Sequence, residues 1–145
     1  MNRKFRRFCQ SGFSLLEVLI TLVIIAIGMM GFAAMMLSSM KNNRIAMQRS
    51  TATFYAYDII DCMRVNRSAA LIGSYTLADF GSLLTGTTVA TSDVNQWQTA
   101  LSTALPSGAG KITFAGNTVT VEIRWTETLN AGDNASHTWS TESTL

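Results

Sequence analysis

Apolar and polar residues follow three successive patterns along this chain. Residues 13–37 are almost uninterruptedly apolar and contain one charged side chain, Glu17. Farther on, apolar residues recur at the three- and four-residue spacing of one helix face, at Ala52, Ala56, Ile59, Ile60 and Met63. Near the end, apolar residues alternate with polar ones, at Val119, Val121, Ile123 and Trp125. These patterns predict an apolar helix, an amphipathic helix and a half-buried antiparallel strand.

The first apolar run is long enough to cross a lipid bilayer. Its residues, about 25 in number, span roughly 37 Å as a helix, against about 30 Å for the hydrocarbon core. A basic leader precedes this run and contains Arg3, Lys4, Arg6 and Arg7. The positive-inside rule therefore predicts a single membrane span with a cytoplasmic amino terminus. A secretory signal is the second interpretation, although its apolar region is usually about 7 to 15 residues long.

The amphipathic pattern continues the same helix. No Pro or Gly occurs between Ala33 and Ala70, so one helix from Phe13 to about Arg67 is expected, about 80 Å long. Gly73 is expected to end it. Three aromatic side chains are expected to broaden the apolar face: Phe54, Tyr55 and Tyr57. Three charged side chains are expected to point away from that face: Arg49, Asp61 and Arg64.

The residues after Gly73 begin with a connection and a short helix. Residues 72–92 are rich in Gly, Ser and Thr and show little periodicity. Residues 93–105 predict a helix that Ser92 or Asp93 caps. Three residues are expected to stop this helix: Pro106, Gly108 and Gly110.

The last part of the chain predicts a small antiparallel sheet. Strands at residues 111–115 and 118–125 form a hairpin around a Gly116-Asn117 turn. A third strand is expected around residues 137–141, after a turn at residues 130–135. The expected fold class is therefore α+β, with a small antiparallel sheet packed on the exposed half of a long helix.

Composition and charge exclude two classes of protein. With 48% hydrophobic and 14% charged residues, the chain of 145 residues is too apolar to be disordered. Its net charge is +2, but four of the 11 basic residues lie in the leader, and the other 7 face 9 acidic residues. The remaining charge of −2 leaves no electrostatic footprint for nucleic acid.

Candidates for catalysis or metal binding are few. His137 is the single histidine and has no neighbouring ligands for zinc. Asp58 and Asp61 are close enough on a helix to share a cation, but Arg64 makes an ion pair the simpler account. Cys62 is expected to be a small buried side chain. We expect no catalytic residue, no cofactor and no metal, and core positions for Trp97, Trp125 and Trp139.

One group of residues at the start of the apolar run identifies a family. Gly12, Phe13 and Glu17 stand in the order Gly-Phe-Ser-Leu-Leu-Glu, after basic residues and before an unbroken apolar helix. This arrangement resembles the prepilin cleavage motif of type IV pilins and of type II secretion pseudopilins. The resemblance implies that prepilin peptidase cuts after Gly12 and methylates the new amino terminus, so that Phe13 becomes N-methylphenylalanine. It also implies that Glu17 acts in subunit assembly.

The chemistry of Glu17 supports this resemblance. An acid in the membrane-embedded part of a helix costs about 2.5 to 3.5 kcal/mol on insertion scales, so it needs a partner or a purpose. We hypothesise that Glu17 pairs with the Phe13 amine of a neighbouring subunit and thereby sets the axial register between subunits. The alternative is a snorkelling acid that stays hydrated at the cytoplasmic interface.

A second resemblance narrows the family. Residues 48–67, residues 93–106 and the strand that ends at Trp125 resemble PilV-type minor pilins, also called type IV pilus modification proteins. The resemblance implies a low-copy subunit that starts pilus assembly near the fibre tip, in contact with other minor and major pilins and with the inner-membrane assembly platform. Many major pilins carry a Pro in the apolar helix and a disulfide-closed loop, and this chain has neither, which disfavours a bulk fibre subunit.

These interpretations predict three regions: a cleaved leader at residues 1–12, a transmembrane and fibre-core helix at 13–37, and a periplasmic or extracellular head at 38–145. The predicted function is a non-enzymatic minor pilin, held in the lipid of the bacterial inner membrane before assembly and then part of a surface pilus that supports twitching motility. A minor pseudopilin of a type II secretion system is the alternative. A membrane-anchored periplasmic binding domain and an exported soluble protein are alternatives from other classes. Adhesion to a host surface and binding of DNA stay open.

Overall fold

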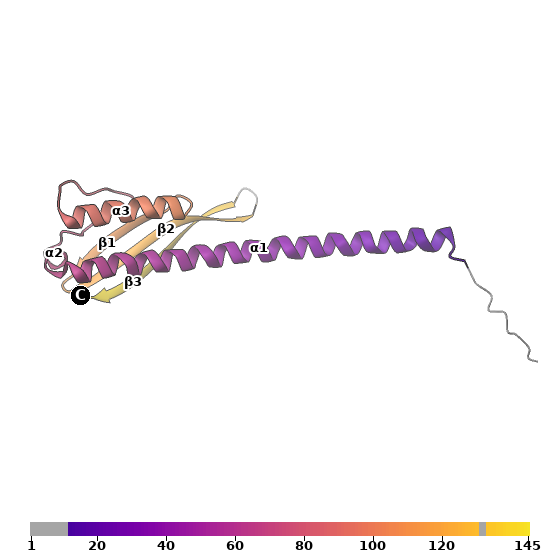
Figure 1. Cartoon of the computed structure of the whole chain (residues 1–145), viewed down its shortest axis with the longest axis horizontal. Coiled ribbons are helices and arrows are strands. Elements are labelled where there is room, and N and C mark those ends of the chain that lie inside the picture. Colours follow the sequence, from indigo (N-terminus) through magenta and orange to yellow (C-terminus); the bar gives the residue numbers. More distant parts are fainter. Residues whose placement is uncertain (1–11, 131–132) are drawn as a thin grey trace, which may run out of the picture. The chain divides into compact units, whose positions relative to one another are not determined.

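The computed structural model describes residues 12–130 and 133–145 (Figure 1). In chain order its elements are α1 (Leu15–Val65), α2 (Arg67–Leu71), α3 (Val89–Ala104), β1 (Ala109–Ala115), β2 (Thr118–Asn130) and β3 (Asp133–Thr144). By their internal contacts the described residues form two units that divide between Met40 and Lys41, and α1 belongs to both. Most of the predicted leader, residues 1–11, lies outside the described residues.

α1 begins directly after a serine. The N–H of Leu16 donates to Ser14 Oγ at 3.3 Å, and the N–H of Glu17 donates to Ser14 O at 3.0 Å. α1 stops at Val65 because Asn66 leaves helical geometry, with φ −107° and ψ 47°, before α2 begins. The predicted long helix is thus confirmed, except for a break at Asn66 that the sequence pattern did not show.

α3 begins before the predicted start. Thr88 caps the helix, because the N–H of Thr91 donates to Thr88 Oγ1 at 3.2 Å. The predicted cap at Ser92 or Asp93 is therefore wrong. The hydroxyl of a threonine can cap the first turn of a helix as well as a serine or an aspartate can. Residue type alone therefore did not decide between these positions.

Trp97 and Gln98 tie α3 to the elements beside it. Trp97 Nε1 donates to Tyr55 O at 2.8 Å, and Gln98 exchanges two hydrogen bonds with the backbone of Gly110, at 2.7 and 3.0 Å. A Cβ at Gly110 would collide with the Trp97 ring. The prediction that Gly110 helps to stop the preceding helix is therefore wrong, because α3 ends at Ala104: Gly110 lies within β1 and leaves the space that Trp97 fills.

The three strands form one antiparallel sheet in the order β1-β2-β3. β1 and β2 make the predicted hairpin, with Ala115 opposite Thr118 and Gly116 in the turn at φ 62°. The third strand is confirmed around residues 137–141, but it is longer than predicted. The predicted turn over residues 130–135 is correspondingly too long, because Ala135 already pairs with Glu127 of β2.

The core of the second unit combines one face of α1 with α3 and the sheet. All five predicted helix positions and all four predicted strand positions are buried. Of the three aromatic residues expected to broaden the apolar face, Tyr55 is partly buried against the core, whereas Phe54 and Tyr57 are 66% and 52% exposed. The reason is the helix geometry: Ala52 and Ala56 face the core, and Phe54 lies half a turn away from both.

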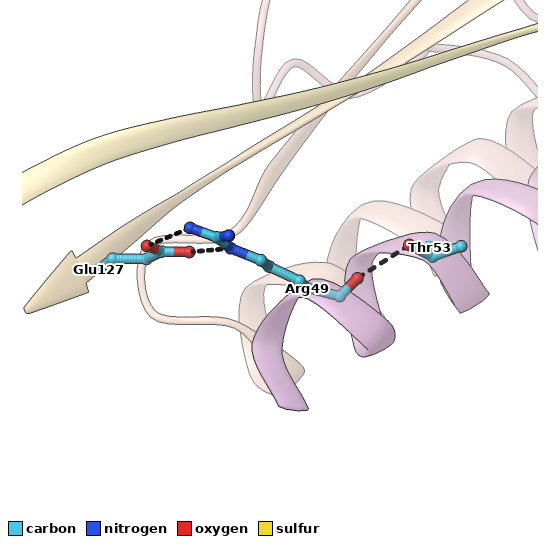
Figure 2. A network of polar contacts seen from close by, with 3 residues as sticks. All are labelled: Arg49, Thr53 and Glu127. Atoms are coloured by element: carbon cyan, nitrogen blue, oxygen red, sulfur yellow. Dashed lines mark hydrogen bonds and ion pairs between the residues drawn. The ribbon is translucent and has the colours of Figure 1, made fainter. Parts of the chain in front are cut away.

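An ion pair joins α1 to β2 (Figure 2). Arg49 Nε and Nη2 donate to Glu127 Oε1 and Oε2 at 3.2 and 3.3 Å. The Glu127 side chain is 3% exposed and that of Arg49 is 52% exposed. The prediction that Arg49 points away from the apolar face is therefore wrong: its side chain reaches a carboxylate that the fold buries. Without the guanidinium, this buried charge would lose both of its donors.

Arg49→Met should lower the free energy of unfolding by about 2 kcal/mol, because Glu127 then keeps a buried carboxylate without a cation. The half-exposed position of Arg49 limits the loss, since water can partly replace the guanidinium. Chemical denaturation of the purified full-length protein in detergent micelles measures the change. The control Arg49→Met/Glu127→Gln should recover much of the loss. A single variant as stable as the unchanged protein would contradict a structural role of the pair.

Candidate functional site

The residues of the predicted cleavage and assembly motif lie together at the start of α1. Gly12 and Phe13 precede the helix, and Glu17 lies in its first turn. Phe13 is 84% exposed, and Glu17 is exposed as well. Ser14 caps the helix between them. Sequence reasoning missed this cap, although the Ser-x-x-Glu spacing of a capping box was the signal for it.

The fold gives no internal reason for a glycine at position 12. A Cβ built on Gly12 meets no heavy atom within 4 Å, and the same holds for Gly28 and Gly31 in the apolar part of α1. Substitution at Gly12 therefore leaves the described structure undisturbed. Within the described residues, nothing but recognition of this segment by another protein is then left to account for an effect of such a change.

The apolar part of α1 is uncovered within its own unit. Large apolar side chains are exposed from Leu15, at 90%, to Met40, at 59%. The most apolar window of 18 residues has a mean hydropathy of 2.6, and none of it is buried. By length and composition this helix can cross a membrane. Such a surface is stable only when lipid or other apolar helices cover it.

Comparison with protein families matches the start of the chain to a known motif. The profile of the prokaryotic N-terminal methylation motif matches residues 7–33. The match begins in the leader, outside the described residues, and continues through Gly12, Phe13 and Glu17 into the apolar part of α1. No curated protein and no solved structure matches the chain.

The fold and the motif together define a class of protein. A long apolar amino-terminal helix with a small three-stranded antiparallel sheet is a type IV pilin-like α+β fold, as expected from the sequence. The motif supports a class III prepilin leader, and with it a pilin-like or pseudopilin-like structural subunit. It implies processing by prepilin peptidase and association with pilins, and together with the apolar helix it fits anchoring in the inner membrane.

In the head, a buried tyrosine joins the end of α1 to α3. Tyr75 is fully buried, and its hydroxyl donates to Asp93 Oδ2 at 2.6 Å and accepts from Asn66 Nδ2 at 3.2 Å. Burial, together with the bond to the Asp93 carboxylate, raises the pKa of Tyr75 to about 12. The neutral phenol is therefore part of the folded head. No periodic pattern marks Tyr75 in the sequence, since it lies in the irregular connection.

Cys62 and two aspartates line a small pocket between α1 and α3. Burial first, and then the charges of Asp93, Asp58 and Asp61, raise the pKa of the Cys62 thiol. These causes favour the neutral thiol over the thiolate. Cys62 is partly buried, and it acts as a small packing side chain rather than as a nucleophile.

The other candidates for chemistry have structural partners. Within residues 12–130 and 133–145, no group of three or more His, Cys, Asp or Glu could hold a metal ion. Asp61 Oδ1 forms the predicted ion pair with Arg64 Nη1 at 2.8 Å. The His137 ring lies against Trp125, with centroids 5.1 Å apart. Trp125 is buried as predicted, and Trp139 is partly buried.

Tyr75→Phe should flatten the loss of stability at high pH. The unfolded pKa is 10.0 and the folded pKa about 12, so the contribution of Tyr75 is complete below pH 10 and is lost as the pH rises through about 12. Between these values the free energy of unfolding should fall by about 1.4 kcal/mol per pH unit. Denaturation of the full-length protein in micelles between about pH 8 and pH 11 measures this slope.

The control for this prediction is Tyr57→Phe, which removes a tyrosine that is 52% exposed and should keep the slope of the unchanged protein. If Tyr75→Phe loses stability above pH 10 as steeply as the unchanged protein, another group causes the decline.

Proposed function

We propose that this chain is a minor pilin of a type IV pilus. The observation that carries the proposal is the methylation motif at the start of a helix whose apolar side chains are all exposed as far as Met40. In this proposal, prepilin peptidase removes residues 1–12 and methylates the amine of Phe13. Residues 13–37 then anchor the subunit in lipid and later form part of the fibre core, and residues 38–145 form the head.

Glu17 and the Phe13 amine are proposed to set the register between subunits. After cleavage, the amine of Phe13 precedes the first turn of α1, and Glu17 lies within that turn. The exposure of Glu17 within its own unit leaves its carboxylate accessible to a neighbouring subunit. Since each charge alone is costly in hydrocarbon, pairing between subunits reduces both penalties as the helix leaves the lipid.

The finer assignment to a minor pilin is supported by the PilV-like residues 48–67 and by the features of major pilins that this chain lacks. Such a subunit would start assembly near the tip, with other minor pilins and the assembly platform as partners. A deletion strain would then have few surface fibres and reduced twitching. A minor pseudopilin shares the motif and the helix, and the genes beside this one would distinguish the two systems.

Gly12→Val should abolish processing, because a branched side chain prevents the close backbone approach that glycine allows. Intact mass and amino-terminal analysis of protein from native membranes measure the result. The unchanged chain should begin at methylated Phe13, and the control Gly31→Ala should be processed normally. An uncut start of the unchanged chain would indicate an ordinary membrane anchor, and a start well beyond Leu37 a secreted protein. Either result would refute the proposal.

Glu17→Ala should reduce incorporation into fibres by about ten-fold, the equivalent of about 1.4 kcal/mol for the lost charge pair. The measurement is the ratio of the variant in sheared fibres to that in membranes, in cells that also make the unchanged chain. Thr21→Ala is the matched control, because the Thr21 hydroxyl bonds within its own helix, to Val18 O at 2.8 Å. Equal incorporation of Glu17→Ala and the unchanged chain would refute the pairing hypothesis.

A further inference from the structure

The two edges of the sheet differ. Beyond β1, the N–H of Leu77 donates to Ile112 O at 2.9 Å, and the N–H of Ile112 donates to Leu77 O at 3.0 Å. The N–H of Gly81 also donates to Gly110 O at 3.3 Å. The chain itself therefore covers the edge of β1 at Gly110 and Ile112. At the opposite edge, no strand of the described residues pairs with the outer side of β3.

β3 lacks the devices that usually protect an edge strand. Natural edges are short, bulged or covered, or they carry Lys or Pro. From Ala135 to Thr144 the strand contains one charged residue, Glu142, and neither Lys nor Pro. Its register with β2 is regular over this stretch, since the irregularity lies at Thr128 and Asn130. The outer side of residues 135–144 is called the open edge below.

The ladder decides which backbone groups face the open edge. The N–H of Leu145 donates to Asn117 O at 3.0 Å, which makes Thr118 and Thr144 a pair without direct hydrogen bonds. Alternate residues back from Thr144 therefore direct their N–H and C=O groups outward: Ser136, Thr138, Ser140, Glu142 and Thr144. The open edge is thus a row of alternating donors and acceptors that an extended chain can match.

We infer that the open edge of β3 binds an edge strand of a different pilin-like subunit that has the same orientation. This inference adds a binding partner to the proposed function. It rests on that function in one respect, because subunits anchored in one membrane all point in the same direction. Main-chain hydrogen bonds supply the contact, and the edge strand of the partner becomes a fourth strand beside β3.

A second copy of this chain does not fit the open edge. Antiparallel pairing of two β3 strands needs a two-fold axis perpendicular to the sheet. This axis reverses the direction of α1 in the second copy. Subunits whose helices enter one membrane from the same side cannot have this relation. Pairing about a two-fold axis parallel to the strands turns the sheet of the second copy over. The face of one sheet that carries the partly buried Trp139 would then continue into the exposed face of the other sheet. Copies of equal orientation would pair β3 with the edge of β1, where Leu77 and Gly81 already occupy the backbone groups of Ile112 and Gly110.

Side chains beside the open edge define the partner strand further. Thr138 and Ser140 place hydroxyl groups on the exposed face of the sheet, and Glu142 adds one negative charge. A strand with Ser or Thr on this face, and Lys or Arg beside Glu142, forms favourable cross-strand pairs. On the opposite face, Trp139 favours an apolar or aromatic neighbour.

Photo-cross-linking in the native host tests the inference. A photoreactive phenylalanine analogue replaces Thr138 at the open edge or, as the matched control, Thr120 on the same face in the central strand β2. We expect Thr138 to cross-link a different chain that carries the methylation motif, identified by mass spectrometry, with a yield about ten-fold above that at Thr120.

A second substitution shows whether the backbone makes this contact. Ser140→Pro removes an outward N–H, which an edge strand tolerates, and should lower the cross-link at Thr138 about ten-fold. Ser140→Ala keeps the N–H and should retain the cross-link. The unfolding midpoint of each variant checks that the head is intact.

Three results would overturn the inference: a cross-link from Thr138 to a second copy of this chain, a yield no higher than at Thr120, or a cross-link that Ser140→Pro leaves unchanged in an intact head. Intact mass of the same preparation distinguishes failure of this inference from failure of the proposed function. An edge cross-link on an unprocessed chain would reject processing and retain the pairing, whereas a processed chain without the cross-link would reject the pairing alone.

Discussion

The packing of a narrow stripe of α1 against the sheet is the interaction on which the head depends. The small side chains of Ala52 and Ala56 are fully buried in this stripe, and so are the larger side chains farther along: Ile59, Ile60 and Met63. β2 contributes four alternating side chains to the same core: Val119, Val121, Ile123 and Trp125. A helix stripe with a period of 3.6 residues thus meets a strand face with a period of two, and the burial of both is the main favourable term in folding.

Polar contacts then fix where the smaller elements sit around this stripe. Trp97 bonds the backbone of α1, Gln98 bonds the backbone of β1, and Tyr75 connects the end of α1 to α3. Each of these groups is buried, so each needs its partner to avoid an unpaired polar atom. The Arg49 and Glu127 pair adds a link between α1 and β2. The arrangement of the head is therefore specified by hydrogen bonds, while its stability comes mainly from apolar burial.

Before Lys41 the same helix has no such stripe. Its residues are apolar on all sides and exposed, so the stabilisation of this half must come from lipid or from other helices. The open edge of β3 is a second incomplete surface, made of backbone donors and acceptors instead of apolar area. A subunit with one apolar and one hydrogen-bonding surface is suited to an assembly in which different chains contact different surfaces.

By itself the sequence determined the long helix, its buried face, the hairpin and the contiguous motif from Gly12 to Glu17, because each depends on local spacing. The roles of Gly12, Phe13 and Glu17 stay predictions, since they depend on other proteins. Only the tertiary structure decided the partner of Arg49, the space beside Gly110 and the burial of Tyr75. These features join segments far apart in the chain, and a pattern of neighbouring residues carries no information about which distant groups meet.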